Sequence, residues 1–171
     1  IGISENSKQF HLFEEIVYKL IVVAEKRKKC LKLYMKLGRR SDIKVSKINL
    51  LSVYKIMINK GTIDYNLDLM MFLQKKPIRN LSGIAIITVL LSPYPEKEDG
   101  TKQEFSCEEN CYYCPNHPEY ARSYVPGEPA TMRGIANGWS ATKQMISRMD
   151  SLYKQGHKIN KIELIIDGGT F

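Results

Sequence analysis

The sequence predicts an α+β to α/β chain in which an N-terminal helical domain precedes a βαβ unit. Three observations lead to this fold class. Apolar residues recur at helical spacing through residues 8–74, two β-branched runs cover residues 84–91 and 162–166, and an amphipathic helical pattern lies between those runs. A strand, a helix and a second strand in that order predict a parallel pair joined by a right-handed crossover. The hydrophobic content of 43% is that of a globular protein.

Three helical segments make up the first domain. The apolar stripe over residues 8–37 predicts one long helix or two short ones, and Gly38 is placed to end it. A further helix is expected at about 46–59, ending at Gly61, and a short one at about 66–74. The side chains expected on the apolar faces of these helices are Phe10, Phe13, Val17, Leu20, Ile21, Ala24, Leu31, Tyr34, Met35, Leu37, Ile48, Leu51, Ile56, Leu67, Met70, Met71 and Leu73.

The second part begins after a charged link that contains proline, at residues 75–79. Both β-branched runs have the continuous apolar pattern of parallel strands that are buried on two faces. Residues 115–137 hold four prolines and little periodicity, which predicts an irregular loop, and a helix is expected at about 139–153, ending at Gly156. Loops that follow parallel strands lie at one edge of a sheet. We therefore expect the segments that follow the two runs to lie together.

Positive charge is concentrated in the first domain. The chain has 26 Lys+Arg and 18 Asp+Glu, a net charge of +8; residues 1–80 hold 17 and 7 of them, and residues 81–171 hold 9 and 11. This asymmetry favours a domain boundary near residue 80. A phosphate-bearing partner for the first domain and a merely solvated helix face both explain the basic cluster. Its members are Lys26, Arg27, Lys28, Lys29, Lys32, Lys36, Arg39 and Arg40.

No apolar run approaches the ~18 to 20 residues that cross a bilayer. The polar N-terminus also lacks the pattern of a signal peptide. We therefore expect no membrane, and a cytoplasmic or nuclear location in which thiols stay reduced.

Three cysteines within eight residues point to a metal centre. Cys107, Cys111 and Cys114 are separated by three and two residues, so a single loop can turn three thiolates toward one point. Three ligands leave one coordination position open for chemistry. His117 follows at a spacing that would instead close a structural zinc site with the three cysteines. The spacing alone leaves the iron–sulfur and zinc interpretations open.

The residues around the cysteines resemble the elongator catalytic subunit family, radical S-adenosylmethionine (SAM) enzymes fused to an acetyltransferase domain that modify wobble uridines of tRNA. The resemblance covers about half the chain and runs through Lys76-Pro77-Ile78-Arg79, Ser82-Gly83-Ile84-Ala85, Ser92-Pro93-Tyr94-Pro95, Phe105-Ser106-Cys107, Asn110-Cys111-Tyr112-Tyr113-Cys114-Pro115-Asn116, Arg122-Ser123-Tyr124, Glu128-Pro129, Met132-Arg133, Gly156-His157, Lys161-Ile162-Glu163 and Gly168-Gly169-Thr170-Phe171. It implies that residues 81–171 begin a radical-SAM partial (β/α) barrel.

The same resemblance implies the cofactors and the residues that hold them. Cys107, Cys111 and Cys114 would bind a [4Fe–4S] cluster whose fourth iron takes SAM, and Tyr113 would pack against that cluster. Gly168, Gly169 and Thr170 would contact SAM, since glycine allows close approach of the backbone. Lys161 would contact acetyl-CoA as the co-substrate. These contacts follow from the resemblance, because a plain turn, a half-buried tyrosine and a solvated lysine explain the same residues otherwise.

The resemblance implies an enzyme, acetyltransferase-like and carboxymethyl-forming, that modifies the tRNA wobble uridine with acetyl-CoA and SAM radical chemistry. tRNA and further elongator-type subunits are the implied partners, with residues 1–80 as the tRNA-binding domain. The alternative is a zinc-stabilised RNA-binding module without catalysis. The chain begins at Ile1 and stops at Phe171 directly after a strand, which needs neighbours, so we expect further sequence and no complete reaction from this chain alone.

Overall fold

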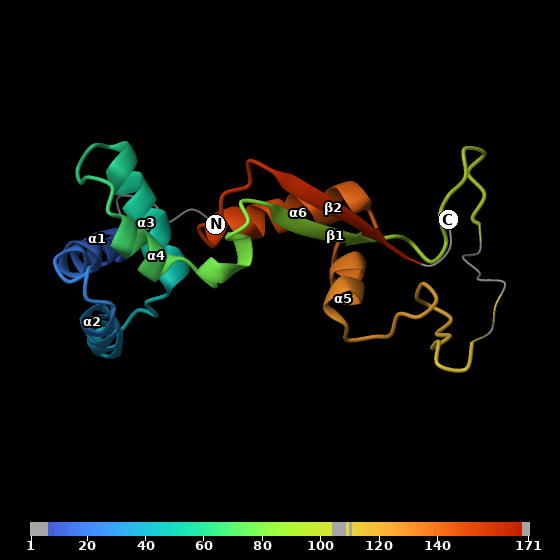
Figure 1. The fold of residues 1–171 in the computed structure, drawn as a ribbon, viewed down its shortest axis with the longest axis horizontal. Helices are drawn as coiled ribbons and strands as arrows, with labels where there is room; N and C mark the ends of the chain where they lie inside the picture. The colour runs from blue at the N-terminus through green and yellow to red at the C-terminus, as the bar shows by residue number, and fades with distance from the viewer. Residues whose placement is uncertain (1–6, 104–108, 110, 169–171) are drawn as a thin grey trace. The chain divides into compact units, whose positions relative to one another are not determined.

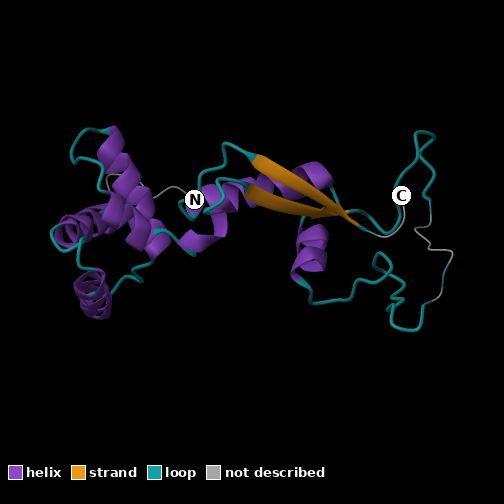
Figure 2. Cartoon of the chain, viewed as in Figure 1, coloured by secondary structure: helices purple, strands orange, loops and turns teal. Residues whose placement is uncertain are grey.

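The computed structural model describes residues 7–103, 109 and 111–168. In chain order these residues form α1 (Lys8–Ile21), α2 (Arg27–Arg40), α3 (Lys47–Asn59), α4 (Leu67–Leu73), the 3₁₀ helix η1 (Pro77–Asn80), β1 (Ala85–Leu90), α5 (Pro129–Ala136), α6 (Ala141–Lys154) and β2 (Ile162–Asp167) (Figures 1 and 2). They divide into a helical unit, Ile1–Gly83 with Leu152–Lys158, and a sheet unit, Ile84–Ser151 with Ile159–Phe171. Within the described ranges every helix is too short or too polar to span a bilayer.

Side-chain caps fix where three helices of the helical unit begin. Ser7, Ser46 and Asn66 each accept a hydrogen bond from the backbone N–H three residues later, at 3.1, 3.1 and 2.9 Å. Each cap satisfies one N–H that has no partner inside its helix, which stabilises a helix start by about 1 kcal/mol. The stripe at residues 8–37 forms two helices, one of the two predicted outcomes, and Gly38 lies inside α2 instead of ending it.

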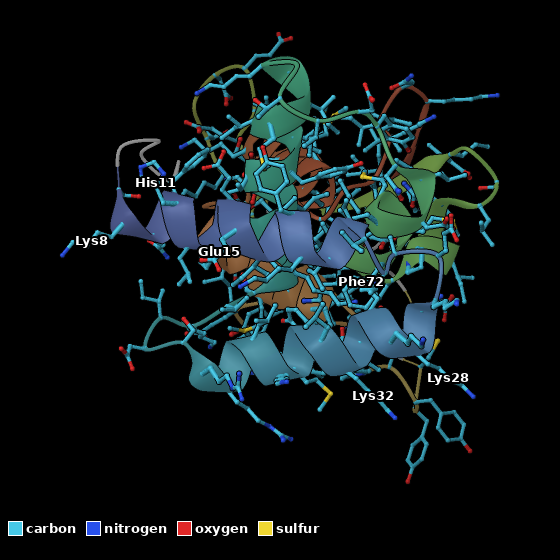
Figure 3. All side chains as sticks on the ribbon, turned by 90° about the vertical axis from the view of Figure 1, so that its left-hand side faces the viewer. Lys8, His11, Glu15, Lys28, Lys32 and Phe72 are labelled. Carbon is cyan, nitrogen blue, oxygen red and sulfur yellow. The ribbon has the colours of Figure 1, made fainter. Side chains whose placement is uncertain are left out.

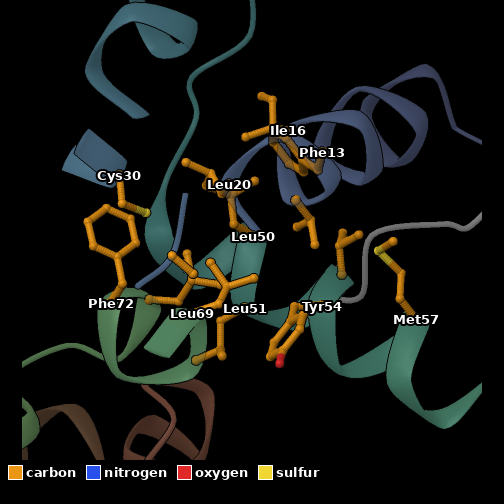
Figure 4. Close-up of a cluster of buried hydrophobic side chains, with 14 of the residues drawn as sticks. Phe13, Ile16, Leu20, Cys30, Leu50, Leu51, Tyr54, Met57, Leu69 and Phe72 are labelled. Carbon is orange, nitrogen blue, oxygen red and sulfur yellow. The ribbon is translucent and has the colours of Figure 1, made fainter. Parts of the chain in front are cut away.

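The core of the helical unit lies between α1, α3 and α4, with α2 packed against them (Figure 4). The core side of α1 agrees with the sequence pattern. On α2 the prediction is partly wrong, because Leu31 and Met35 are 45% and 47% exposed while the thiol of Cys30 lies beside the ring of Phe72. On α4, Leu67 and Met71 were also predicted to be buried, and both are exposed.

The end of α6 completes the helical unit. His157 is almost fully buried, and its Nε2 lies 2.9 Å from the carbonyl oxygen of Lys75, to which it donates. Its Nδ1 therefore accepts from the side-chain amide of Gln74 at 3.1 Å. Gly156 has φ +91°, and a Cβ there would lie 2.8 Å from Leu51 Cδ2. The segment Leu152–Lys158 thus docks on α3 and α4 so closely that glycine is required.

The sheet unit is built on two parallel strands. β1 pairs with β2 in a register that joins Ala85 to Ile162 and Leu90 to Asp167, as the strand–helix–strand order predicts. The expectation that both strands are buried on two faces is wrong for β2 and partly wrong for β1. On β2 the side chains of Leu164, Ile165 and Ile166 are exposed, and on β1 the side chain of Ile86 is 52% exposed.

A glutamine of α6 forms hydrogen bonds to the backbone of β1 on the side of that strand that faces away from β2. Gln144 is fully buried, accepts from the N–H of Leu90 at 3.0 Å and donates to its carbonyl at 2.8 Å. Successive residues of a strand point their N–H and C=O groups to opposite sides, so the Leu90 groups face away from β2. The side-chain amide takes the place that a neighbouring strand would otherwise fill.

The segment 115–137, predicted to be irregular, contains a helix. α5 begins with Pro129 at its first position, where the missing proline N–H needs no partner and the fixed φ suits a helix. Its fully buried residues are Thr131 and Gly134. The proline that argued against regular structure is therefore the start signal of α5.

Candidate functional site

The C-terminal ends of β1 and β2 lie side by side, and the sequence predicts that the loops that follow them meet there. The N–H of Leu91 donates to the carbonyl of Asp167 at 2.9 Å, so the loop that leads to the cysteines and the segment that begins with Gly168 leave from the same edge (Figure 1). Gly168 is buried at φ +137°, and a Cβ there would lie 3.1 Å from Leu91 Cβ and 3.3 Å from Leu91 N. Close packing against β1 already requires this glycine. Its role on SAM stays a prediction, and Gly169 and Thr170 lie outside the described residues.

Two of the three predicted ligands share one turn. The N–H of Cys114 donates to the carbonyl of Cys111 at 3.1 Å, and both side chains are free thiols. Cys111 is exposed and Cys114 half-buried, while Cys107 lies outside the described residues. Closely spaced, reachable thiols are the donor type that iron–sulfur clusters take, so the described pair fits such a group. Within the described ranges, no three His, Cys, Asp or Glu side chains are gathered as a metal site.

The two other side chains singled out near the cysteines have different surroundings. His117 accepts a hydrogen bond at Nδ1 from the N–H of Glu119 at 3.3 Å, and its ring centroid lies 4.6 Å from that of Tyr120. Tyr113 is 93% exposed and meets Tyr112 edge-on at 5.3 Å between ring centroids. Packing of Tyr113 against a cofactor therefore stays a prediction.

Hydrogen bonds hold the segment that follows the cysteines. The hydroxyl of Tyr94, in the loop after β1, donates to the carbonyl of Pro118 at 2.5 Å. Ser123 N–H donates to the carbonyl of Pro115 at 3.0 Å. Burial raises the pKa of Tyr124, and the carboxylates of Asp167 and Glu128 raise it further. The bond from Tyr94 thus joins Pro118 to the loop that follows β1, and the bond from Ser123 closes residues 115–123 into a compact loop.

Lys161 lies at the other end of the sheet. It immediately precedes β2, its side chain is exposed, and its carbonyl accepts from the N–H of Ala85 at 2.8 Å. A six-residue strand is about 20 Å long. The structure therefore separates Lys161 from Gly168 by roughly that distance, and its contact with acetyl-CoA stays a prediction.

In the helical unit, α2 carries a face made almost wholly of cations, which we call the basic face. Every lysine and arginine side chain of α2 is exposed, and α2 contains no acidic residue. Figure 3 shows Lys28 and Lys32 projecting from α2 away from α1. A hollow of about 370 Å³ lies on the same helix and is lined by Lys32, Met35, Lys36, Arg39 and Arg40. The members of the basic face are Lys28, Lys29, Lys32, Lys36, Arg39 and Arg40.

Repulsion among the cations of the basic face lowers the stability of α2. Lys28, Lys32 and Lys36 follow one another at four-residue spacing, about 6 Å apart along the helix axis. Like charges at this spacing destabilise a helix by about 0.2–0.5 kcal/mol per pair. A polyanion laid along the helix would reverse the sign of this effect.

A further cation lies beneath α2. The ammonium of Lys47 donates to the carbonyl of Phe72 at 2.5 Å and lies 3.9 Å from the centroid of its ring. Burial lowers the pKa of Lys47, and the nearby Arg27 lowers it further. Burial also raises the pKa of the Cys30 thiol, which the Lys47 charge partly offsets. Cys30 is therefore a buried, protonated thiol in the core of the helical unit.

Comparison with known proteins shows where the chain belongs. No protein-family model matches it. The tRNA uridine(34) acetyltransferase of Methanocaldococcus jannaschii is 41% identical over 104 residues, which cover 58% of this chain and 17% of that protein. Elongator complex protein 3 of Drosophila melanogaster is 30% identical over 178 aligned residues, covering 100% of this chain and 30% of that protein. The human protein of the same name is 37% identical over 112 residues, covering 63% and 20%.

This chain spans less than a third of the length of each of these relatives. The similarity nevertheless reaches archaeal and eukaryotic proteins alike, and in the fly protein it extends over the whole chain. It confirms the resemblance that the cysteine, proline and glycine motifs carry. The chain belongs to the elongator catalytic subunit family, the family of Elongator complex protein 3 and the tRNA uridine(34) acetyltransferases.

Proposed function

We propose that this chain is part of an enzyme that modifies uridine 34, the wobble position of tRNA. Its relatives are named for tRNA uridine(34) acetyltransferase activity and for the Elongator complex. The finer proposal is a carboxymethyl-type modification that uses acetyl-CoA and SAM, with further elongator-type subunits as partners. In this proposal residues 81–171 form the opening of a radical-SAM partial (β/α) barrel.

The observation that carries the proposal is the shared edge of the sheet. The loop of the cysteines and the glycine segment begin where β1 and β2 end, joined by the bond from Leu91 to Asp167. In βα folds this edge is the one that carries active sites. Cys107, Cys111 and Cys114 would hold a [4Fe–4S] cluster there, and Gly168, Gly169 and Thr170 would approach SAM. When bound, that pair of cofactors supplies one-electron cleavage of SAM.

The residues of this chain would bind and shield the cofactors. On the turn from Cys111 to Cys114 one thiol is exposed and the other half-buried, and the segment that follows is joined to Tyr94 by the hydrogen bond to the carbonyl of Pro118. We expect this bond to keep the chain that follows the ligand turn close to the loop after β1. The basic face of α2 would hold the phosphate backbone of tRNA, because cations in a regular row release counterions when a polyanion binds.

Anaerobic reconstitution with iron and sulfide tests the cluster. We expect the full chain to gain a brown chromophore with about four irons, and Cys111→Ala and Cys114→Ala to lose it. Cys30→Ala is the matched control and should retain it, because Cys30 is buried in the other unit. No chromophore in the unaltered chain, together with tight stoichiometric zinc that requires His117, would contradict the cluster and favour the zinc-stabilised RNA-binding module.

A salt titration of tRNA binding tests the basic face. Replacing Lys28 and Lys32 by glutamine should weaken binding and reduce the slope of log affinity against log salt by roughly 1.5. The same change at Lys8 and Lys44, two exposed lysines outside α2, is the matched control. Equal effects of both pairs would mean that net charge alone, and not α2, determines binding.

A further inference from the structure

The turn between α5 and α6 holds a tryptophan in an unfavourable backbone conformation. Trp139 has φ +59°, directly after Gly138 at φ +57°. A bulky residue in this left-handed region costs about 1–2 kcal/mol. The backbone of the turn is fixed by hydrogen bonds from Gly138 N–H to the carbonyl of Ile135 at 3.0 Å and from Trp139 N–H to the carbonyl of Gly134 at 2.8 Å. The strain is therefore held in place by the helix end itself.

The indole ring rests on a glycine that has no room for a side chain. A Cβ built on Gly134 of α5 would lie 2.6 Å from Cζ3 and 2.7 Å from Cε3 of Trp139. Gly134 is buried in a helix, where glycine destabilises by about 1 kcal/mol relative to alanine. A strained tryptophan and an unfavourable glycine thus combine to seat one ring at one place.

From that seat a row of rings leads to the cysteine turn. The centroid of Trp139 lies 6.2 Å from that of Tyr120, with the planes at 61°, and Tyr120 lies 4.6 Å from His117. His117 follows Cys114 by three residues. Edge-to-face and tilted ring pairs at these distances contribute about 0.5–1.5 kcal/mol each beyond the area they bury. The row Trp139–Tyr120–His117, which we call the aromatic bracket, thus joins α5 to the chain beside the metal ligands.

We propose that the aromatic bracket positions the cysteine turn, with Trp139 as its fixed point and Tyr120 as the link. The inference rests on the proposed function, because it gives the bracket a metal-binding turn to hold. Trp139 acts through Tyr120 and the backbone of residues 115–124, so it is a positioning residue and not a ligand. The bracket also gives His117 a role other than zinc binding, since its ring is packed on Tyr120.

The test uses the full chain and its single tryptophan. Trp139 is the only tryptophan in the sequence, so intrinsic fluorescence reports on the bracket without a label. In the absence of metal, Gly134→Ala should shift the emission of Trp139 to the red, because the new Cβ displaces the ring from its seat. Anaerobic loading with iron and sulfide should quench the emission of the unaltered chain.

The rate at which a chelator removes iron from the loaded chain measures the positioning. Tyr120→Leu and Trp139→Ala should lose iron about tenfold faster, the lower end of the effect of residues that orient metal ligands. Trp139→Phe should restore most of the retention, and Tyr18→Leu on α1, the matched control, should leave the rate unchanged. Far-UV circular dichroism shows which variants keep the fold. If Trp139→Ala does not fold, the chelator rate of Tyr120→Leu tests the proposal.

The outcomes separate the two proposals. A chromophore with the same spectrum and the same chelator rate in all variants would overturn the bracket and leave the proposed function standing. Failure of the unaltered chain to take up iron would overturn the proposed function, and an unshifted emission in Gly134→Ala would then overturn the seat of Trp139 as well. Faster iron loss in Tyr120→Leu and in Trp139→Ala, with most of the retention kept in Trp139→Phe, would support both.

Discussion

Replacing Gln144 by methionine should destabilise the sheet unit by removing two buried hydrogen bonds. The substitution keeps the length of the side chain but removes both of its hydrogen bonds to Leu90, at 3.0 and 2.8 Å. Leu90 and Gln144 are fully buried, so water does not readily replace the lost partners. A buried donor or acceptor left unpaired costs about 1–3 kcal/mol. Two such groups predict a loss of about 2–6 kcal/mol.

Hydrogen exchange measures this loss at the affected atom. In the Gln144→Met variant the amide of Leu90 should exchange at least about 30-fold faster, since about 2 kcal/mol corresponds to that factor. The amide of Val89, which points to β2 in the alternating ladder, is an internal reference and should change only as far as the whole unit is destabilised.

Lys143→Met is the matched control, because it places the same side chain at an exposed neighbouring position of α6. It should leave the exchange of Leu90 and the unfolding midpoint unchanged. If Gln144→Met also leaves both unchanged, the side-chain amide does not replace a neighbouring strand, and the account of the side of β1 that faces away from β2 is wrong.

Three further changes probe the helical unit. Gly156→Ala should lower its free energy of unfolding by about 2–3 kcal/mol, through a positive φ and a Cβ 2.8 Å from Leu51; Gly61→Ala, at φ +69° with open space around it, isolates the backbone part at about 1 kcal/mol. Tyr54→Phe removes a buried hydroxyl that donates to the carbonyl of Asn66 and accepts from its N–H, and urea denaturation should show a loss of about 1–2 kcal/mol. Burial raises the pKa of Cys30 above its ordinary 9.0, so only the unfolded chain loses this proton just above pH 9, and stability should fall there more steeply in the unaltered protein than in Cys30→Ala. Parallel slopes for the two proteins would show that the folded thiol ionises as readily as the unfolded one.

The sequence predicts the helices best where one face alone is apolar. On α1 the core side chains Phe10, Phe13, Val17 and Leu20 share a single phase, and all four are buried. On α2 apolar residues occur in two phases. The pattern cannot decide between Leu31 with Met35 and the side that carries Cys30, because the buried side depends on contacts with other helices, such as that of Tyr34 with Phe72 of α4 at 6.0 Å between ring centroids.

Short elements and buried polar groups are harder to predict. α5 has eight residues, too few for a clear period, although Pro129 at its first position is a start signal that can be read. Gln144 looks like a solvent-facing residue until the free backbone groups of Leu90 are known.

The candidate site was predictable in part from chain order. Spacing places Cys111 and Cys114 on one turn, as the structure shows, while the seat of Trp139 depends on a contact with Gly134 that no local pattern reveals. Chain order also indicates that Lys161, which precedes β2, lies at the sheet edge opposite to Gly168.

The docking of Leu152–Lys158 on α3 and α4 has a consequence for how the protein is made. Residues 1–83 leave the ribosome before the segment Leu152–Lys158, in which Gly156 contacts Leu51 and His157 accepts a hydrogen bond from Gln74. In the nascent chain the surface of α3 and α4 that this segment covers therefore stays exposed until His157 has been synthesised. A fragment that stops near residue 83 lacks the same contacts. It should aggregate more readily and be less stable than the helical unit within the intact polypeptide.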